Sequence, residues 1–243
     1  MAYTLETYQL PSNGKLEGVP KEVTIRNMTT AEEKMLLGSA EDVFDQIIKK
    51  CVVKPEDFDI SKIPIMDKNF LYIRIRVISY GQDYKFSFRC PECGAMSTTT
   101  INLDDAVEVN YLPDDYTEPF DTFELPVCGD TVSLKLPRNE DFTKMKARVR
   151  RYNNKFPDAV GDQTWIYGLM AFISQINGKD VDAKLQSYVE GLHVKDASYI
   201  RHRVNKLDAG VSDTVVVHCN KCGEDVEVAI PTGVNFFHTD FDD

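Results

Sequence analysis

The chain has 243 residues, of which 42% are hydrophobic and 28% charged, and its formal net charge is −11. This length and composition are ordinary for a globular protein with a substantial core, in one large domain or two smaller ones. No run of about twenty apolar residues is present, which excludes a membrane-spanning helix. The acidic balance argues against general nucleic-acid binding, because phosphate neutralisation requires an excess of cations.

The N-terminal part, residues 1–80, predicts short extended pieces followed by helices. Thr30, with Glu33 three residues later, fits a capping box at the start of the first helix, and a second helix is expected soon after it. The segment 69–79 alternates apolar and polar residues and therefore fits either a strand or a buried helix. We favour the helix because Asp67 precedes it in the position of a cap.

The most informative feature is a pair of short cysteine motifs, residues 90–94 (Cys-Pro-Glu-Cys-Gly) and 219–223 (Cys-Asn-Lys-Cys-Gly). Each lies between stretches in which apolar and polar residues alternate, as in β-strands. A Cys-x-x-Cys-Gly turn between strands is the shape of a zinc knuckle, in which the glycine takes a positive φ and backbone amides face the sulfurs. Two knuckles supply four thiolates, the closed tetrahedral shell of a structural Zn²⁺ site. The candidate metal ligands are therefore Cys90, Cys93, Cys219 and Cys222.

Other uses of these cysteines are less consistent with the sequence but stay open. A thioredoxin-like redox pair precedes a helix, whereas strand-type sequence follows both motifs here. Disulfides are typical of secreted chains, and no signal segment opens this one. The ligands of an iron–sulfur cluster usually lie in one stretch of chain. The two remaining cysteines, Cys51 and Cys128, have apolar neighbours and are expected to be small buried side chains.

The two motifs frame a long insertion. Joining them closes a loop of 125 residues (94–218), at a cost of about 4–5 kcal/mol in chain entropy. Within it we expect a β-hairpin turning at 128–130 and then helices from 139 to 206, with Asn177-Gly178 as a helix stop. The predicted fold class is α+β, with zinc-ribbon-like hairpins, N-terminal helices and a largely helical insertion. The predicted parts are an N-terminal segment (1–80), a ribbon module (81–112 with 211–235), the insertion (113–210) and an acidic, aromatic tail (236–243).

One segment departs from the acidic balance, because residues 144–155 hold six cations and no acid. Apolar residues at helical spacing fall on one face of the same predicted helix: Phe142, Met145, Val149 and Tyr152. The simplest interpretation is a docked helix with a solvated basic face. The sharper one is a docking surface for an acidic partner, including a second copy of the chain. The acids that such a copy would offer are Asp240, Asp242 and Asp243.

No catalytic constellation is recognisable. The chain lacks a Gly-rich phosphate loop, a Gly-x-Ser-x-Gly elbow and a His-Glu-x-x-His motif. Its four histidines are scattered, and a metal shell without an open position is not a catalytic site. The sequence therefore predicts a protein that is not an enzyme.

Several segments have a recognisable order along the chain. These are residues 10–14 (LPSNG), 23–33 (VTIRNMTTAEE), 70–76 (FLYIRIR), 79–81 (SYG) ahead of the first cysteine motif, 125–137 (LPVCGDTVSLKLP) and the second cysteine motif. This order resembles the T4-type bacteriophage baseplate protein family over most of the chain. The resemblance implies a non-enzymatic role in building or completing the baseplate of a contractile tail. The chain would be a hub component or an assembly chaperone of the hub.

The same resemblance implies other baseplate and hub proteins as partners, in the virion tail or in the host cytoplasm during assembly. Self-association is a further expectation from the charge pattern, whereas neither membrane nor nucleic acid is an expected partner. Phe236, Phe237 and Phe241 are a candidate anchor for a partner, with core packing as the simpler alternative. The alternative function is a zinc-ribbon adaptor that binds nucleic acid or the transcription machinery, which the acidic balance disfavours.

Overall fold

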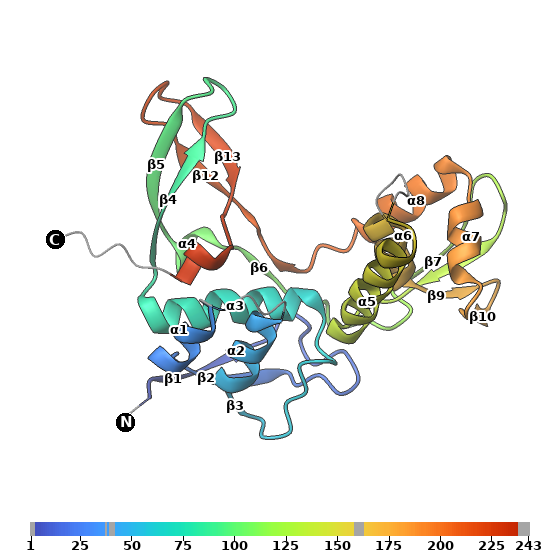
Figure 1. The fold of residues 1–243 in the computed structure, drawn as a ribbon, viewed down its shortest axis with the longest axis horizontal. Helices are drawn as coiled ribbons and strands as arrows, with labels where there is room; N and C mark the ends of the chain where they lie inside the picture. Colours follow the sequence, from blue (N-terminus) through green and yellow to red (C-terminus); the bar gives the residue numbers. More distant parts are fainter. Residues whose placement is uncertain (1–2, 37, 39–41, 158–162, 238–243) are drawn as a thin grey trace. The chain divides into compact units, whose positions relative to one another are not determined.

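The structure is a computed structural model, and it describes residues 3–36, 38, 42–157 and 163–237. Its class is α+β, with helices and several small antiparallel sheets (Figure 1). Two compact units divide the chain. Unit 1 comprises residues 1–60, 66–112 and 209–243, and unit 2 comprises residues 61–65 and 113–208. Within the described ranges, no helix combines the length and the apolar character needed to cross a membrane.

A three-stranded antiparallel sheet and three helices form the N-terminal part of unit 1. They are β1 (Leu5–Gln9), β2 (Glu22–Arg26), β3 (Val52–Lys54), α1 (Thr30–Leu36), α2 (Val43–Cys51) and α3 (Ile65–Tyr80). The ambiguous segment 69–79 is helical, as favoured, but the helix begins at Ile65, so Asp67 lies within its first turn and is not the cap. Because α3 lies between the sheet and the two ribbons of unit 1, it buries residues on several faces, including Phe70, Leu71 and Ile75 (Figure 1).

The predicted cysteine hairpins form two separate β-ribbons in unit 1, the first of β4 (Asp83–Arg89) with β5 (Met96–Asn102) and the second of β12 (Thr214–His218) with β13 (Asp225–Ala229). Each strand alternates buried and exposed residues, as period-two patterning requires. The buried apolar side chains of the ribbons, counting Ile230 directly after β13, are Tyr84, Phe86, Phe88, Ile101, Val215, Val217, Val226 and Ile230. The short strands β6 (Val109–Asn110) and β11 (Gly210–Val211) also pair, next to the single-turn helix α4 (Leu103–Ala106).

Unit 2 combines a four-stranded antiparallel sheet, in the order β10-β9-β8-β7, with four helices. The strands are β7 (Asp121–Glu124), β8 (Thr131–Leu134), β9 (Ile173–Ile176) and β10 (Lys179–Asp180), and the helices are α5 (Asn139–Lys155), α6 (Gln163–Phe172), α7 (Leu185–Gly191) and α8 (Val194–Val204). The hairpin turning at 128–130 is present. The unit has its own core, which includes Leu134, Tyr167, Leu169, Ile173 and Ile200.

The expectation that a helix continues to the stop at Asn177-Gly178 is wrong for residues 173–176, and residues 179–180 also form a strand. The chain leaves α6 at Phe172 and pairs with β8 as strand β9. Asn177 and Gly178 have φ of 51° and 71° and turn the chain from β9 into β10. An Asn-Gly pair with positive φ at both residues is the favoured turn of a tight hairpin, so the same dipeptide that resembles a helix stop serves a hairpin here.

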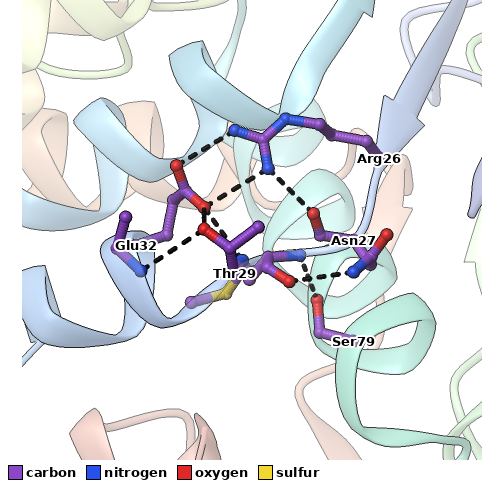
Figure 2. A network of polar contacts seen from close by, with 7 residues as sticks. Arg26, Asn27, Thr29, Glu32 and Ser79 are labelled. Carbon is purple, nitrogen blue, oxygen red and sulfur yellow. Dashed lines mark hydrogen bonds and ion pairs between the residues drawn. The ribbon is translucent and has the colours of Figure 1, made fainter. Parts of the chain in front are cut away.

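The predicted capping box is displaced by one residue. The Glu32 carboxylate, rather than that of Glu33, accepts hydrogen bonds from the amide (2.9 Å) and hydroxyl (2.7 Å) of Thr29, and the Thr29 hydroxyl accepts from the Ala31 amide (3.3 Å). Arg26 donates to both carboxylate oxygens of Glu32, at 3.0 and 3.3 Å. Figure 2 shows how this network links strand β2 to the first turn of α1.

These hydrogen bonds favour the ionised form of the Glu32 carboxyl group. The Arg26 guanidinium and the Thr29 donors outweigh burial and lower the pKa of Glu32 from 4.5 to about 2. The folded state therefore binds the ionised form more tightly than the unfolded chain does. Its contribution to stability is complete above about pH 4.5 and is lost as the pH falls through about 2.

We expect Glu32→Gln to lower the free energy of unfolding by about 3 kcal/mol at neutral pH, the equivalent of this pKa difference. Denaturant unfolding between pH 7 and pH 2 measures the effect, which should shrink below pH 4.5. Glu17→Gln, at an exposed position, is the matched control. Equal stability of the Glu32 variant and the parent at pH 7 would contradict the prediction.

The aromatic residues before the end of the described chain are core residues. Phe236 is 0% and Phe237 is 1% exposed, in a cluster with Phe44, Tyr72 and Tyr84. The hypothesis that both phenylalanines anchor a partner is therefore wrong, and core packing is the outcome. Phe241, the third member of that hypothesis, lies outside the described residues.

Arg76 of α3 lies under both ribbons and is 2% exposed. Its guanidinium donates hydrogen bonds to the carbonyls of Gly81, Asp83 (2.7 Å) and Phe236 (3.4 Å), and it contacts the rings of Tyr84 and Phe236. Gly81 and Asp83 lead into the first ribbon, and Phe236 follows the second. The buried guanidinium of Arg76 therefore links the base of one ribbon to the base of the other through hydrogen bonds.

Candidate metal centre

The structure brings the four predicted ligands together at the tips of the two ribbons (Figure 1). The sulfurs of Cys90, Cys93, Cys219 and Cys222 all lie within 4.8 Å of one another. Two contacts cross between the turns, Cys90 to Cys222 at 3.8 Å and Cys93 to Cys219 at 3.9 Å. A tetrahedron with Zn–S bonds of about 2.3 Å has edges of about 3.8 Å, so the four sulfurs fit the shell of such an ion.

The two turns contribute to the cluster in the same way. The first cysteine of each, Cys90 or Cys219, is buried, whereas the second, Cys93 or Cys222, is exposed. The first cysteine of each turn contacts the second cysteine of the other turn, so an approximate two-fold axis relates the two turns. The side chain of Asn220 fixes the pairing further, since it donates to the Thr98 carbonyl of the first ribbon at 3.0 Å.

Each cysteine turn has the same backbone hydrogen bonds. In both, the amide of the first cysteine donates to the carbonyl five residues later, and the glycine amide donates to the carbonyl of that cysteine, all at 2.9 Å. Gly94 and Gly223 have φ of 70° and 82°, in the left-handed region that glycine occupies without strain. The glycine of each motif is therefore required by the turn.

Backbone amides and neighbouring sulfurs move the thiol pKa values apart. The amides of Cys222 and Lys221 face the Cys219 sulfur and lower the pKa of Cys219 to about 6. At Cys222, the Glu224 amide acts in the same direction, but desolvation of the sulfur by its neighbours and hydrogen bonds with the sulfurs of Cys219 and Cys93 raise the pKa to about 12. Four thiolates this close repel one another, and a bound cation removes that repulsion. The donor set and its charge therefore fit a thiolate-binding metal ion.

A third turn, residues 125–130 between β7 and β8 of unit 2, has the same backbone without the sulfur pair. Its first amide donates to the sixth carbonyl at 2.8 Å, and its glycine amide donates to the first carbonyl at 3.1 Å. Leu125 stands where the other turns have their first cysteine. The amides of Val127 and Cys128, which correspond to the pair facing Cys219, donate to the carboxylate of Asp196 at 2.8 and 3.2 Å.

Comparison of the three turns shows that two of the amide groups in such a turn need an anion as a hydrogen-bond acceptor. Two N–H groups point at one place, and an anion satisfies them there. In unit 2 the anion is the fully buried Asp196 carboxylate, and in the second ribbon it is the Cys219 sulfur. This relation was not predicted, although the x-Pro-x-Cys-Gly pattern that residues 90–94 and 125–129 share is a signal for it.

The two other cysteines differ in their surroundings. Cys51 is buried, as expected, and burial raises the pKa of its thiol to about 12. Cys128 is exposed, so the expectation that it is a buried side chain is wrong. Backbone hydrogen bonds close the hairpin turn that contains Cys128, so the turn does not require a buried side chain at this position.

The fold and the cysteine cluster define a class of protein: an α+β chain whose distant ribbons meet at a four-sulfur site. A comparison with protein families gives the particular family. The model for the T4 bacteriophage base plate protein matches residues 2–238, nearly the whole chain. The chain belongs to this family. No curated protein matches the chain, and no solved structure matches it.

Membership of this family supports a phage baseplate component and a place in the virion tail. It suggests a non-enzymatic role and interaction with other baseplate proteins. The four cysteines are compatible with a metal site. Among the described residues, they form the one group of three or more His, Cys, Asp or Glu side chains close enough together to hold a metal ion.

Proposed function

We propose that the chain is a non-enzymatic component of the baseplate hub of a contractile tail, or a chaperone that assembles that hub. The family match over residues 2–238 carries the proposal, because it spans both structural units rather than one local motif. Its partners are other baseplate and hub proteins. It acts in the virion tail, or in the host cytoplasm while the tail is assembled.

A structural Zn²⁺ ion is part of the proposal. Cys90, Cys93, Cys219 and Cys222 would hold it, and their sulfur spacing supports this assignment. The ion would supply a cross-link between the ribbons, with no open position for catalysis. Such a link suits a protein whose role is to present surfaces to partners.

The proposal is tested by recovering a tagged copy of the full chain from infected cells and identifying the co-purified proteins by mass spectrometry. We expect baseplate or hub proteins among them. The same measurement on purified virions distinguishes the two roles, since a hub component stays in the particle and a chaperone is found only in cells. Retention of DNA or RNA in a low-salt gel shift, without recovery of tail proteins, would favour the nucleic-acid adaptor instead.

A further inference from the structure

A row of cations runs along one exposed face of α5. Lys144, Arg148, Arg151 and Lys155 follow one another at spacings of four, three and four residues, which places them in line on a helix. All four are exposed. In a chain with a net charge of −11, this face is the strongest local departure from the average charge.

Little of this charge is neutralised within the described part of the chain. Lys144 pairs with Glu140 at 2.6 Å, and Lys155 lies over the ring of Phe156. The described residues give no acidic partner for Arg148 or Arg151. Like charges at these spacings destabilise a helix by about 0.2–0.5 kcal/mol per pair, so an anionic ligand along the row would stabilise α5.

Two hollows flank the row, and both are lined by Lys144 and Arg148. One, of about 360 Å³, lies over the small side chains of Thr143 and Ala147 and reaches Arg151. The other, of about 350 Å³, is lined by apolar side chains that include Met145, Met170 and Val181, and also by Lys135, Asp141 and Asp182. Cations beside a hollow with apolar side chains suit a peptide in which carboxylates and a large apolar side chain are close together.

We infer that this face of α5 binds residues 238–243 (His-Thr-Asp-Phe-Asp-Asp) of a second copy of the chain. Asp240, Asp242 and Asp243 supply the carboxylates for the row, and Phe241 supplies the apolar side chain for the Met-lined hollow. The segment starts from a fixed point, because Phe237 is buried in the core of unit 1. Six extended residues span about 20 Å, enough to cover the row from Lys144 to Lys155, which is about 16 Å along a helix.

The simplest assembly of this kind is a closed pair, in which each copy's segment binds the basic face of the other. Each copy offers one basic face and one acidic segment, so two copies form two identical contacts. The contact is electrostatic at its edges and is therefore expected to weaken with salt. The inference goes beyond the proposed function and does not require the metal, because α5 belongs to unit 2.

The test is the oligomeric state of the full chain by sedimentation velocity over a range of concentrations, at low and high salt. We expect self-association that weakens at high salt and at least tenfold in the double variant Arg148→Glu, Arg151→Glu. The control Lys146→Glu, Arg150→Glu makes the same change in net charge on another face of α5 and should associate as the parent does.

A second pair of variants excludes misfolding as the cause. Asp240→Lys with Asp242→Lys should also abolish self-association. When this variant is mixed with the Arg148→Glu, Arg151→Glu variant, both contacts are again complementary, and the mixture should form the pair that neither forms alone. A parent chain that stays monomeric at every concentration, or a mixture that fails to associate, would overturn the inference. So would low-salt DNA binding that Arg148→Glu, Arg151→Glu removes while the oligomeric state is unchanged.

Discussion

Replacing Cys219 with serine, or removing the proposed Zn²⁺ ion with a chelator, is expected to separate the two ribbons and to lower the stability of unit 1 by several kcal/mol. Cys219 is fully buried and contacts Cys93 of the other turn at 3.9 Å. Serine has no thiolate, so the shell would keep three sulfurs. The amides that face the Cys219 sulfur would also lose their anion.

The size of the effect follows from two opposed terms. Holding the ribbons together closes a loop of 125 residues (94–218), which costs about 4–5 kcal/mol. Structural zinc contributes about 10–16 kcal/mol in apparent terms in small peptides. The stabilisation by the metal is larger than the cost of closing the loop. Without the metal, only the apolar contacts between the ribbons offset that cost. The insertion is therefore expected to become sensitive to protease.

Metal content of the purified chain by elemental mass spectrometry, the melting temperature and limited proteolysis measure this result. Cys128→Ser is the matched control, since it makes the same change in a turn of the same backbone that has no sulfur partner. We expect one equivalent of zinc in the parent and in this control. A parent chain without metal, or a Cys219→Ser variant with the melting temperature and protease resistance of the parent, would refute the prediction.

Arg76→Leu is expected to destabilise unit 1 by about 3–5 kcal/mol. The substitution removes the donors to the carbonyls of Gly81, Asp83 and Phe236, and it leaves the buried Phe236 carbonyl without that partner. A hydrogen bond from a charged donor contributes about 1.5–3 kcal/mol, and an unsatisfied buried acceptor adds to the loss. Relief of the buried charge, whose pKa burial lowers, offsets part of it.

Unfolding in guanidinium, followed by near-ultraviolet circular dichroism of the aromatic cluster, measures this effect. The single tryptophan, Trp165, belongs to unit 2, so its fluorescence follows that unit separately. Arg76→Lys keeps the charge but not the planar fork, and an intermediate loss is expected. Arg150→Leu, at an exposed helical position, is the control and should change stability little. Equal loss in that control and in Arg76→Leu would show that Arg76 has no special role.

Local patterns in the sequence were sufficient to predict the two β-ribbons. Alternation along 84–88 and 226–230, with a glycine directly after each second cysteine, specifies strand, turn and strand without reference to the rest of the chain. The meeting of the two turns could be expected because four thiolates at this spacing have one common use. The N-terminal capping box was found but displaced, since Thr29 and Thr30 are equally good caps by type.

Long-range contacts account for what sequence reasoning missed. Strand β9 follows an apolar helix directly, and short apolar runs have no periodicity that separates helix from strand. The pairing of residues 173–176 with residues 132–134 of β8 decides between the two. In the same way, the role of Asp196 depends on the amides of Val127 and Cys128, far away in the chain. The burial of Arg76 could not be predicted either, because it depends on three carbonyl groups that only the structure shows.

The division of the chain has a consequence for dissecting the protein. Unit 2 includes residues 61–65 as well as 113–208, so the polypeptide passes from one unit to the other after residues 60, 65, 112 and 208. The short segment is structural, because Ile63 is fully buried and its carbonyl accepts from the Asn139 amide at 2.8 Å. A single proteolytic cut at any one of these junctions leaves three covalent connections. A fragment of residues 113–208 expressed alone would lack Ile63, so neither unit can be excised as one continuous piece.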